Sequence, residues 1–280
     1  MSTAAQHSLE VADPDCVAPE EAVELLGGVP WRRLVVLGDS IAAGVREPVA
    51  GYVDLGFADR VGAALCSAHP DAAYRNLGVR DLRLAQIRDG QLPAALAAEP
   101  DLAIVIGGGN DAISRHWDHD RAERELLEIL RPLGRAGALV VTVGLFDLAR
   151  SGLVAPEYAG DLTARFDELD ALTAAAAAAA GALHVDTHHH PRASDPAIFA
   201  SDMMHANARG HAIAFAGSCA PWPRRPDAQR SLSVTAVRRL RDTGDAPPAA
   251  STDRTRITYT PRGSARRAAK PQRAVPRAVR

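Results

Sequence analysis

The sequence contains few aromatic residues, few cysteines and almost no lysine. Aromatic side chains make up 4% of the 280 residues, and Lys270 is the only lysine. The three cysteines, Cys16, Cys66 and Cys219, are odd in number and lack metal-ligand spacing, which is typical of reduced thiols rather than a disulfide framework. No apolar run approaches the roughly 18 residues of a membrane span, and the first residues lack a signal-peptide pattern. We therefore expect a cytoplasmic protein.

Charge is distributed unevenly along the chain. The net charge is −2 overall, but residues 221–280 carry 15 basic and 4 acidic side chains, which leaves a net −13 for residues 1–220. This basic tail is rich in Pro, Arg and small residues without apolar periodicity, so we expect it to be largely disordered. Contact of the tail with nucleic acid or another acidic surface is the alternative, although no aromatic interleaving supports it. The pattern predicts an N-terminal extension with a short helix (1–30), a folded domain (31–220) and the tail.

Within the folded domain, short β-branched runs alternate with longer stretches of helical spacing. The runs cover residues 33–38, 73–78, 102–109, 138–144 and 182–187. Strands that alternate with helices form parallel sheets covered on both faces. The sequence therefore predicts a three-layer α/β/α, flavodoxin-like domain with a five-stranded parallel sheet. In such domains ligands bind at the carboxyl ends of the strands.

The first predicted strand ends in Gly38-Asp39-Ser40. A serine hydroxyl at this edge is inert unless a base takes its proton and donors stabilise the oxyanion that forms. The base candidate is His205, in the loop before the last predicted helix, and Asp202 lies three residues before it. At this spacing the Asp202 carboxylate can accept the imidazole Nδ1–H and leave Nε2 facing Ser40.

Candidate oxyanion donors follow three predicted strands. Asn110 offers a side-chain NH₂, and Gly78 and Ser40 offer backbone N–H groups that no bulky side chain obstructs. Ser40 thus serves both as nucleophile and, through its N–H, as donor. These residues together predict nucleophilic catalysis.

Four separated blocks in this order resemble the SGNH or GDSL-type hydrolases. The blocks are "GDSIAAG", "NLG", "GGND" and "DMMHANARG", within residues 32–217. The resemblance implies the SGNH hydrolase fold over residues 31–220 and hydrolysis of an ester or thioester without a cofactor or metal. It also implies the same roles for Ser40, Gly78, Asn110, Asp202 and His205.

The chain departs from the pattern at two places. Arg80 and Asp81 follow Gly78 where many relatives continue with small residues, and Met203 and Met204 stand between Asp202 and His205 where a Gly and an apolar residue are common. Neither departure removes a catalytic group. Both bear on substrate choice, and the methionines are suited to lining an apolar pocket.

Three other motifs suggest different chemistry, but each of them fits its pattern poorly. Residues 38–42 have Ala where the G-x-S-x-G nucleophile elbow requires its last Gly, which argues against an α/β-hydrolase. Residues 107–112 fit a loose dinucleotide fingerprint but lack an acidic ribose partner. The run from His188 to His190 suggests metal binding, but consecutive side chains diverge, so we expect a solvated loop there.

Three functions remain open at this point. The first is a serine esterase that cleaves a small-molecule acyl ester or thioester through an acyl-enzyme. The second is an acyltransferase with the same machinery, and the third is a non-catalytic relative that binds ligands in the same cleft. The loop from 145 to 157 is the longest variable segment near the expected site, and we expect it to act as a lid.

Overall fold

The computed structural model describes residues 7–219 and 256–258, and it places the described strands in one parallel sheet. The strand order is β2-β1-β3-β4-β5-β6. The strands are β1 (Arg33–Gly38), β2 (Ala73–Asn76), β3 (Leu102–Ile106), β4 (Leu139–Val143), β5 (Leu183–Asp186) and β6 (Arg256–Thr258). The first five are the strands that the sequence predicts, so the parallel α/β sheet is confirmed.

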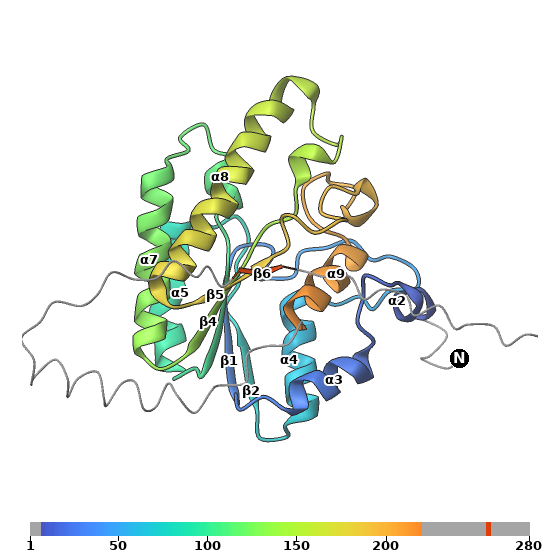
Figure 1. Ribbon diagram of the computed structural model, residues 1–280, viewed down its shortest axis with the longest axis vertical. Helices are drawn as coiled ribbons and strands as arrows, with labels where there is room; N and C mark the ends of the chain where they lie inside the picture. The colour runs from blue at the N-terminus through green and yellow to red at the C-terminus, as the bar shows by residue number, and fades with distance from the viewer. Residues whose placement is uncertain (1–6, 220–255, 259–280) are drawn as a thin grey trace, which may run out of the picture.

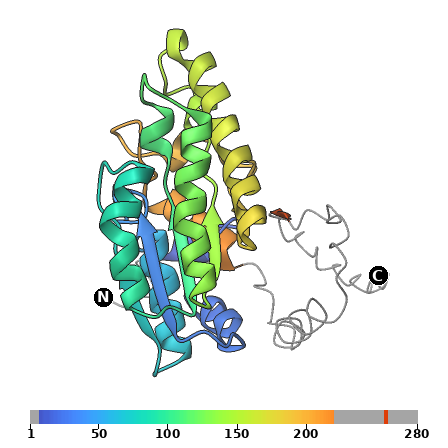
Figure 2. The ribbon, with the colours of Figure 1, turned by 90° about the vertical axis from the view of Figure 1, so that its left-hand side faces the viewer.

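Helices cover both faces of the sheet (Figure 1). One layer contains α5 (Leu84–Ala97), α7 (His119–Arg135) and α8 (Pro156–Ala180), and Figure 2 shows α7 in front of the sheet. The opposite layer contains α3 (Pro19–Gly27), α4 (Phe57–Ala68) and α9 (Ala208–Cys219). Shorter elements are α2 (Ser8–Ala12), α6 (Gly109–Ala112), and the 3₁₀ turns η1 (Leu148–Arg150) and η2 (Pro196–Ile198). The result is the expected three-layer arrangement.

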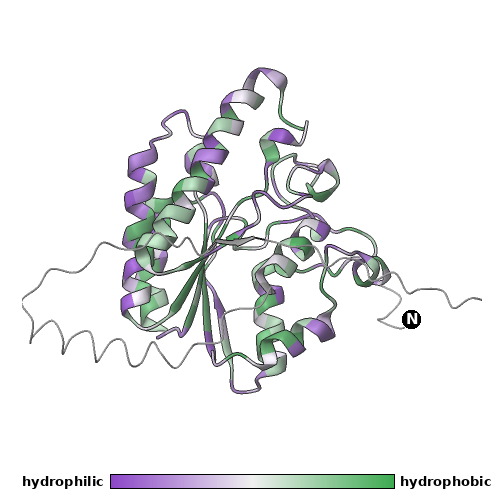
Figure 3. Cartoon of the chain, viewed as in Figure 1, coloured by the Kyte–Doolittle hydropathy of each residue, from purple (hydrophilic) through white to green (hydrophobic). Residues whose placement is uncertain are grey.

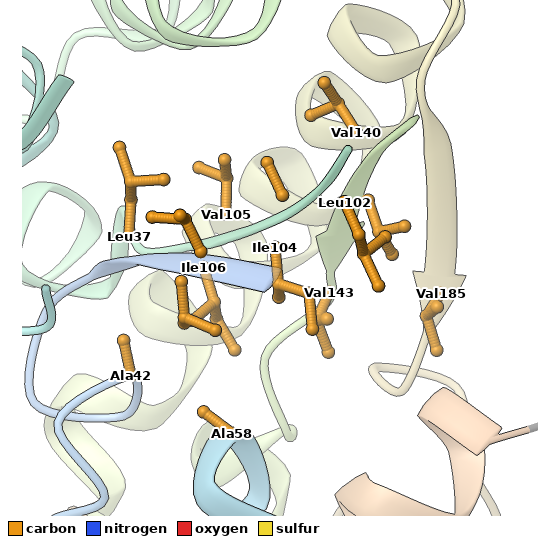
Figure 4. Packing of buried hydrophobic residues seen from close by; sticks show 14 of the residues in the cluster. Leu37, Ala42, Ala58, Leu102, Ile104, Val105, Ile106, Val140, Val143 and Val185 are labelled. Carbon is orange, nitrogen blue, oxygen red and sulfur yellow. The ribbon is translucent and has the colours of Figure 1, made fainter. Parts of the chain in front are cut away.

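The central strands form because their residues suit a sheet that is buried on both faces. β3 is buried at every position, and β1 at every position after Arg33. β-Branched side chains pack well on such a surface, so the strands read as continuous apolar runs rather than alternating ones. Figure 4 shows Leu37, Ile104, Ile106 and Val143 packed together, and the hydropathy colours of Figure 3 show the strands as the most apolar part of the fold.

Helix ends follow local sequence signals. Asp118 caps α7, since its carboxylate accepts the Arg121 N–H at 2.9 Å. Pro156 begins α8, and Gly181 ends it with φ +69°, a left-handed conformation that favours glycine. Local sequence signals therefore account for the start of α7 and for both ends of α8.

The sixth strand was not predicted. β6 lies within the tail and pairs with β5 in parallel, with Val185 opposite Ile257. The predictions that the tail is largely disordered, or contacts an acidic surface, otherwise concern residues outside those that the structure describes.

The N-terminal extension packs against the domain through buried charges. Glu10 in α2 forms a buried ion pair with Arg60 of α4, with Oε1 2.5 Å from Nη1. The same carboxylate accepts the Val53 N–H at 2.7 Å. Beyond α2, Asp13 binds both the Tyr52 hydroxyl and Arg209. The extension thereby connects the loop before α4 to the start of α9.

We expect Glu10→Ala to lower the free energy of unfolding by about 3 kcal/mol, because it leaves the Arg60 guanidinium buried without its charge partner. Urea denaturation measures the change. Glu24→Ala, which removes an exposed carboxylate from α3, is the matched control and should cost less than about 1 kcal/mol. A loss at Glu10 as small as that of the control would contradict the role of this ion pair.

Candidate active site

Ser40 lies two residues after the end of β1 and is 6% exposed. The turn that presents it requires Gly38, since a Cβ atom there would lie 2.0 Å from the Ile106 carbonyl oxygen of the neighbouring strand β3. Because glycine has no Cβ atom, the end of β1 can lie this close to β3 as the chain turns towards Ser40. The serine therefore lies where the sequence predicts, at the carboxyl edge of the sheet.

The three residues of the expected triad form a continuous chain of hydrogen bonds. His205 Nε2 is 2.9 Å from Ser40 Oγ, and His205 Nδ1 is 2.7 Å from Asp202 Oδ2. His205 is 8% exposed, while the Asp202 side chain is about half exposed. A carboxylate that holds Nδ1–H leaves Nε2 free to accept the serine proton. The arrangement can support nucleophilic attack by Ser40.

The loop that carries Asp202 and His205 is fixed by its own backbone. Asp202 Oδ1 accepts the N–H groups of Met204 and His205, each at 3.0 Å. Met203, which lies between Asp202 and Met204, has φ +55°, in the left-handed region that favours glycine. This conformation gives a physical reason for the glycine that is common between the Asp and the His in the family pattern, and Met203 adopts it with a side chain present.

Glu47 also holds this loop, a role that no sequence motif indicates. Its carboxylate accepts the Ser201 N–H at 2.6 Å, and its carbonyl oxygen accepts the Ala208 N–H at 2.9 Å. These bonds flank the segment that contains Asp202 and His205. No spacing rule could have connected Glu47 and Ser201, because 154 residues separate them.

The hydrogen bonds around Asp202 keep it ionised. Burial alone would raise the pKa of Asp202, but the His205 side chain and two backbone N–H groups outweigh burial and hold the pKa below its ordinary value. A carboxylate that stays charged can stabilise positive charge on the imidazole when Ser40 loses its proton.

The structure brings Asn110 to the site but not Gly78. Asn110 lies in α6 and lines the pocket beside Ser40, with one side-chain N–H donated to the Leu82 carbonyl oxygen at 2.9 Å. The Gly78 N–H instead donates to Asn76 Oδ1 at 2.9 Å, and Gly78 does not line the pocket. A Cβ atom at Gly78 would lie 2.4 Å from the Ala43 nitrogen. Close packing therefore accounts for this glycine in the structure.

Two buried titratable groups lie near the expected triad. Burial raises the pKa of Asp39 to about 6, despite the Ile41 N–H and the nearby His205, which favour its charged form. Burial lowers the pKa of His211 to about 4. His211 Nδ1 accepts the Phe57 N–H at 3.0 Å, and Nε2 lies 3.1 Å from the Val45 carbonyl oxygen. His211, a residue of α9, thus packs against the start of α4.

The prediction of a solvated histidine loop after β5 is wrong. His188 and His190 are 3% and 4% exposed, and only the side chain of His189 reaches the surface. His188 Nδ1 is 3.0 Å from the Leu145 carbonyl oxygen, and Nε2 is 3.0 Å from Asp167. The loop folds back over the end of the sheet, so two of its three rings are buried.

Two clusters near this loop contain side chains of the kind that hold metal ions. The first is Asp147, Asp167 and His188, and the second is Asp170, Asp186 and His189. In the first, the Arg150 guanidinium already binds both carboxylates. In the second, His189 Nδ1 is 2.9 Å from Asp186. A cation of the chain itself therefore compensates the carboxylate charge of the first cluster, and a side-chain hydrogen bond occupies part of the second.

A pocket opens beside Ser40. Its volume is about 840 Å³ when the part open to solvent is included. Polar groups of Ser40, Asn110 and His205 lie at one part of its wall, and apolar side chains form most of the rest. Residues of the expected lid, Leu145, Phe146 and Leu148, contribute to that wall. The site therefore combines a reactive polar group with an apolar cavity.

Comparison with known proteins identifies the family. Residues 36–213, from within β1 to within α9, match the GDSL-like lipase/acylhydrolase family. The chain belongs to this family. The match supports ester hydrolase activity, and the fold is the SGNH hydrolase fold that the sequence blocks implied. Among curated proteins none matches the chain.

Solved structures share this GDSL-like fold at low sequence identity. A catalytic mutant of Axe2, an acetylxylan esterase from Geobacillus stearothermophilus, is 18% identical with a TM-score of 0.55, over 67% of this chain and 92% of its own. LAE5, an α/β hydrolase enzyme from the metagenome of Lake Arreo in Spain, is 21% identical with a TM-score of 0.53, over 67% and 95%. TesA is 19% identical with a TM-score of 0.50, over 66% and 95%. Within the described part of this GDSL-family chain, no helix is long and apolar enough to cross a membrane.

We expect Asp39→Asn to change how stability depends on pH. The pKa of Asp39 is raised from 3.8 to about 6 in the folded protein, so the folded state takes up this proton first, and stability from Asp39 increases as pH falls from 6 towards 3.8. The variant lacks this gain. The stability of the variant minus that of wild type should therefore be about 2 kcal/mol less favourable at pH 4 than at pH 7.

Urea denaturation of both proteins at the two pH values measures this difference. Asn can still accept the Ile41 N–H that Asp39 Oδ1 accepts at 3.0 Å, so the turn before Ser40 is preserved. Asp71→Asn, which removes an exposed carboxylate, controls for the loss of one charge. If the free energies of unfolding of wild type and variant differ by the same amount at both pH values, burial does not perturb the pKa of Asp39.

Proposed function

We propose that this protein is a serine esterase that cleaves an acyl ester or thioester through an acyl-enzyme. Ser40 is the nucleophile and His205 is the general base. Asp202 orients the imidazole and stabilises the positive charge that it acquires. The observation that carries the proposal is the unbroken hydrogen-bonded chain from Asp202 through His205 to Ser40. Family membership supports the same class of reaction.

In the first half of the proposed reaction, Ser40 Oγ attacks the carbonyl carbon while His205 Nε2 takes the hydroxyl proton. The carbonyl oxygen becomes an oxyanion, for which the Ser40 N–H and the Asn110 side chain are the proposed donors. Gly78, the third donor that the sequence suggested, would first have to exchange its bond to Asn76 Oδ1. His205 then gives its proton to the departing alcohol or thiol, and the acyl group stays on Ser40.

In the second half, water attacks the acyl-enzyme. His205 takes a proton from this water and returns one to Ser40 Oγ as the acid leaves. The burial of Ser40 and His205 restricts the water around the reacting atoms. An oxyanion is stabilised more strongly in such surroundings than in bulk water.

Ser40→Ala should lower kcat for a p-nitrophenyl ester by about 10³-fold or more, because the members of a triad act as a unit. Release of p-nitrophenol by the purified proteins measures it. A fluorophosphonate probe should label wild-type protein and fail to label the variant. Ser67→Ala, which alters an exposed serine of α4, is the matched control and should behave as wild type. Wild-type turnover by Ser40→Ala would contradict the assignment, and no turnover by wild type on any ester would favour the non-catalytic alternative.

Asn110→Ala should lower kcat by about 10²-fold and leave KM nearly unchanged, because an oxyanion donor acts mainly in the transition state. Steady-state kinetics on the same ester separate the two constants. The variant must keep the wild-type melting temperature, since Asn110 also bonds the Leu82 carbonyl oxygen. If kcat is unchanged in a stable variant, Asn110 is not an oxyanion donor.

A further inference from the structure

The pocket beside Ser40 separates polar and apolar groups. Asp39, Ser40, Asn110 and His205 gather where the reaction would occur. Most of the other lining residues are apolar, from the ends of β3 and β4, from α8 and from the loop after β4, and the buried Thr187 and His211 are the further polar residues among them. An ester carbonyl attached to an alkyl chain has the same division of polarity.

The pocket also deepens from an exposed mouth to a buried floor. At the mouth, Ile113 and Met204 are 40% and 51% exposed. At the floor, Ile106, Val143 and Phe166 are at most 6% exposed. An acyl chain that enters here would leave water progressively, and each buried methylene is worth roughly fourfold in an equilibrium constant.

Ion pairs hold the apolar wall in place. Asp147 caps η1, and its carboxylate binds the Arg150 guanidinium at 2.6 Å. Arg150 also binds Asp167 of α8 with both terminal nitrogens, at 2.8 and 2.7 Å. These contacts connect the loop that carries Leu145, Phe146 and Leu148 to the helix that carries Phe166. The expected lid is therefore anchored, and the pocket is formed before ligand binds.

A second, smaller cavity adjoins this wall, and its volume is about 210 Å³ when the part open to solvent is included. Four residues line both cavities, namely Val143, Gly144, Leu145 and Phe166. The second cavity is also lined by the buried polar groups Asp170 and Thr173, which do not line the first. Phe166 and its neighbours thus close the first cavity, and the polar groups beyond them disfavour an alkyl chain that passes through.

We propose that this pocket selects medium-length, unbranched acyl chains, and that Phe166 sets the upper limit of chain length. The inference rests on the proposed function, because it assigns the pocket to the acyl half of an ester cleaved by Ser40. An acetyl group would leave the apolar floor uncovered. A chain of palmitoyl length would meet Phe166 and, beyond it, the polar end of the second cavity.

A series of p-nitrophenyl esters tests this directly. The value of kcat/KM should rise from acetate through butyrate to octanoate, by at least about tenfold in total, and fall for palmitate. A preference for acetate, or a profile without chain-length dependence, would overturn the proposal while leaving the esterase assignment intact.

Substitutions at Phe166 should move the limit in opposite directions. Phe166→Leu, which opens the wall towards the second cavity, should shift the preferred chain to a longer one, and Phe166→Trp should shift it to a shorter one. Phe215→Leu is the matched control, because Phe215 is equally buried in α9 but does not line the pocket. It should lower stability without moving the profile. If both Phe166 variants keep the wild-type profile, Phe166 does not limit chain length.

A binding measurement separates this proposal from the proposed function. In calorimetric titrations of Ser40→Ala, which cannot form an acyl-enzyme, methyl octanoate should bind at least about tenfold more tightly than methyl acetate. This preference is expected even if wild-type protein hydrolyses no ester, in which case only the esterase assignment fails. Equal affinity for the two esters would overturn the pocket assignment whatever the activity.

Discussion

Ser40 and His205 are 165 residues apart in sequence, yet their side chains lie within 2.9 Å, and the candidate site depends on this one contact. Ser40 follows β1, whereas His205 lies on the loop beyond β5, with β3 and β4 between the two strands. The loop must therefore cross back over the edge of the sheet. A parallel sheet makes this possible because the carboxyl ends of all its strands lie at one edge.

Several bonds away from the triad keep the returning loop in position. Phe199 and Ala206 pair across its base in an antiparallel bridge, and Glu47 accepts N–H groups on either side of it. α9 begins immediately afterwards, and His211 on that helix accepts the first N–H of α4 through its ring. A buried ring can accept this bond only when that nitrogen is unprotonated, and its lowered pKa keeps it so.

The buried groups near the triad make opposing contributions to stability as pH falls. For His211, with a folded pKa of about 4 against 6.5, the unfolded state takes up the proton first, so stability is lost between pH 6.5 and 4. For Asp39, with a folded pKa of about 6 against 3.8, stability is gained over nearly the same range. The two contributions largely offset one another. The fold can thus bury an acid and a base beside the site with little net dependence on pH from this pair.

Sequence patterns predicted the features that depend on local signals, and long-range contacts account for the rest. The buried strands are continuous apolar runs, and Ser40, Asn110, Asp202 and His205 each belong to a short block at a strand end, so their convergence followed from the topology of a parallel sheet. Gly78 also belonged to such a block, but the bond from its N–H to Asn76 depends on backbone geometry that a tripeptide does not reveal.

The pocket illustrates why substrate choice was the least predictable property. Its wall combines residues of β3, β4, α8 and α9 with the loop after β4, and no periodicity relates these segments to one another. The ion pairs from Arg150 to Asp147 and Asp167 decide whether that loop is a mobile cover or a fixed wall, and the sequence showed only that it was long and of mixed polarity. Catalytic groups can be recognised in short blocks because their chemistry requires particular residue types. A binding cavity requires only a shape and a polarity, which many different side chains can supply, so it becomes visible only when the fold has brought its walls together.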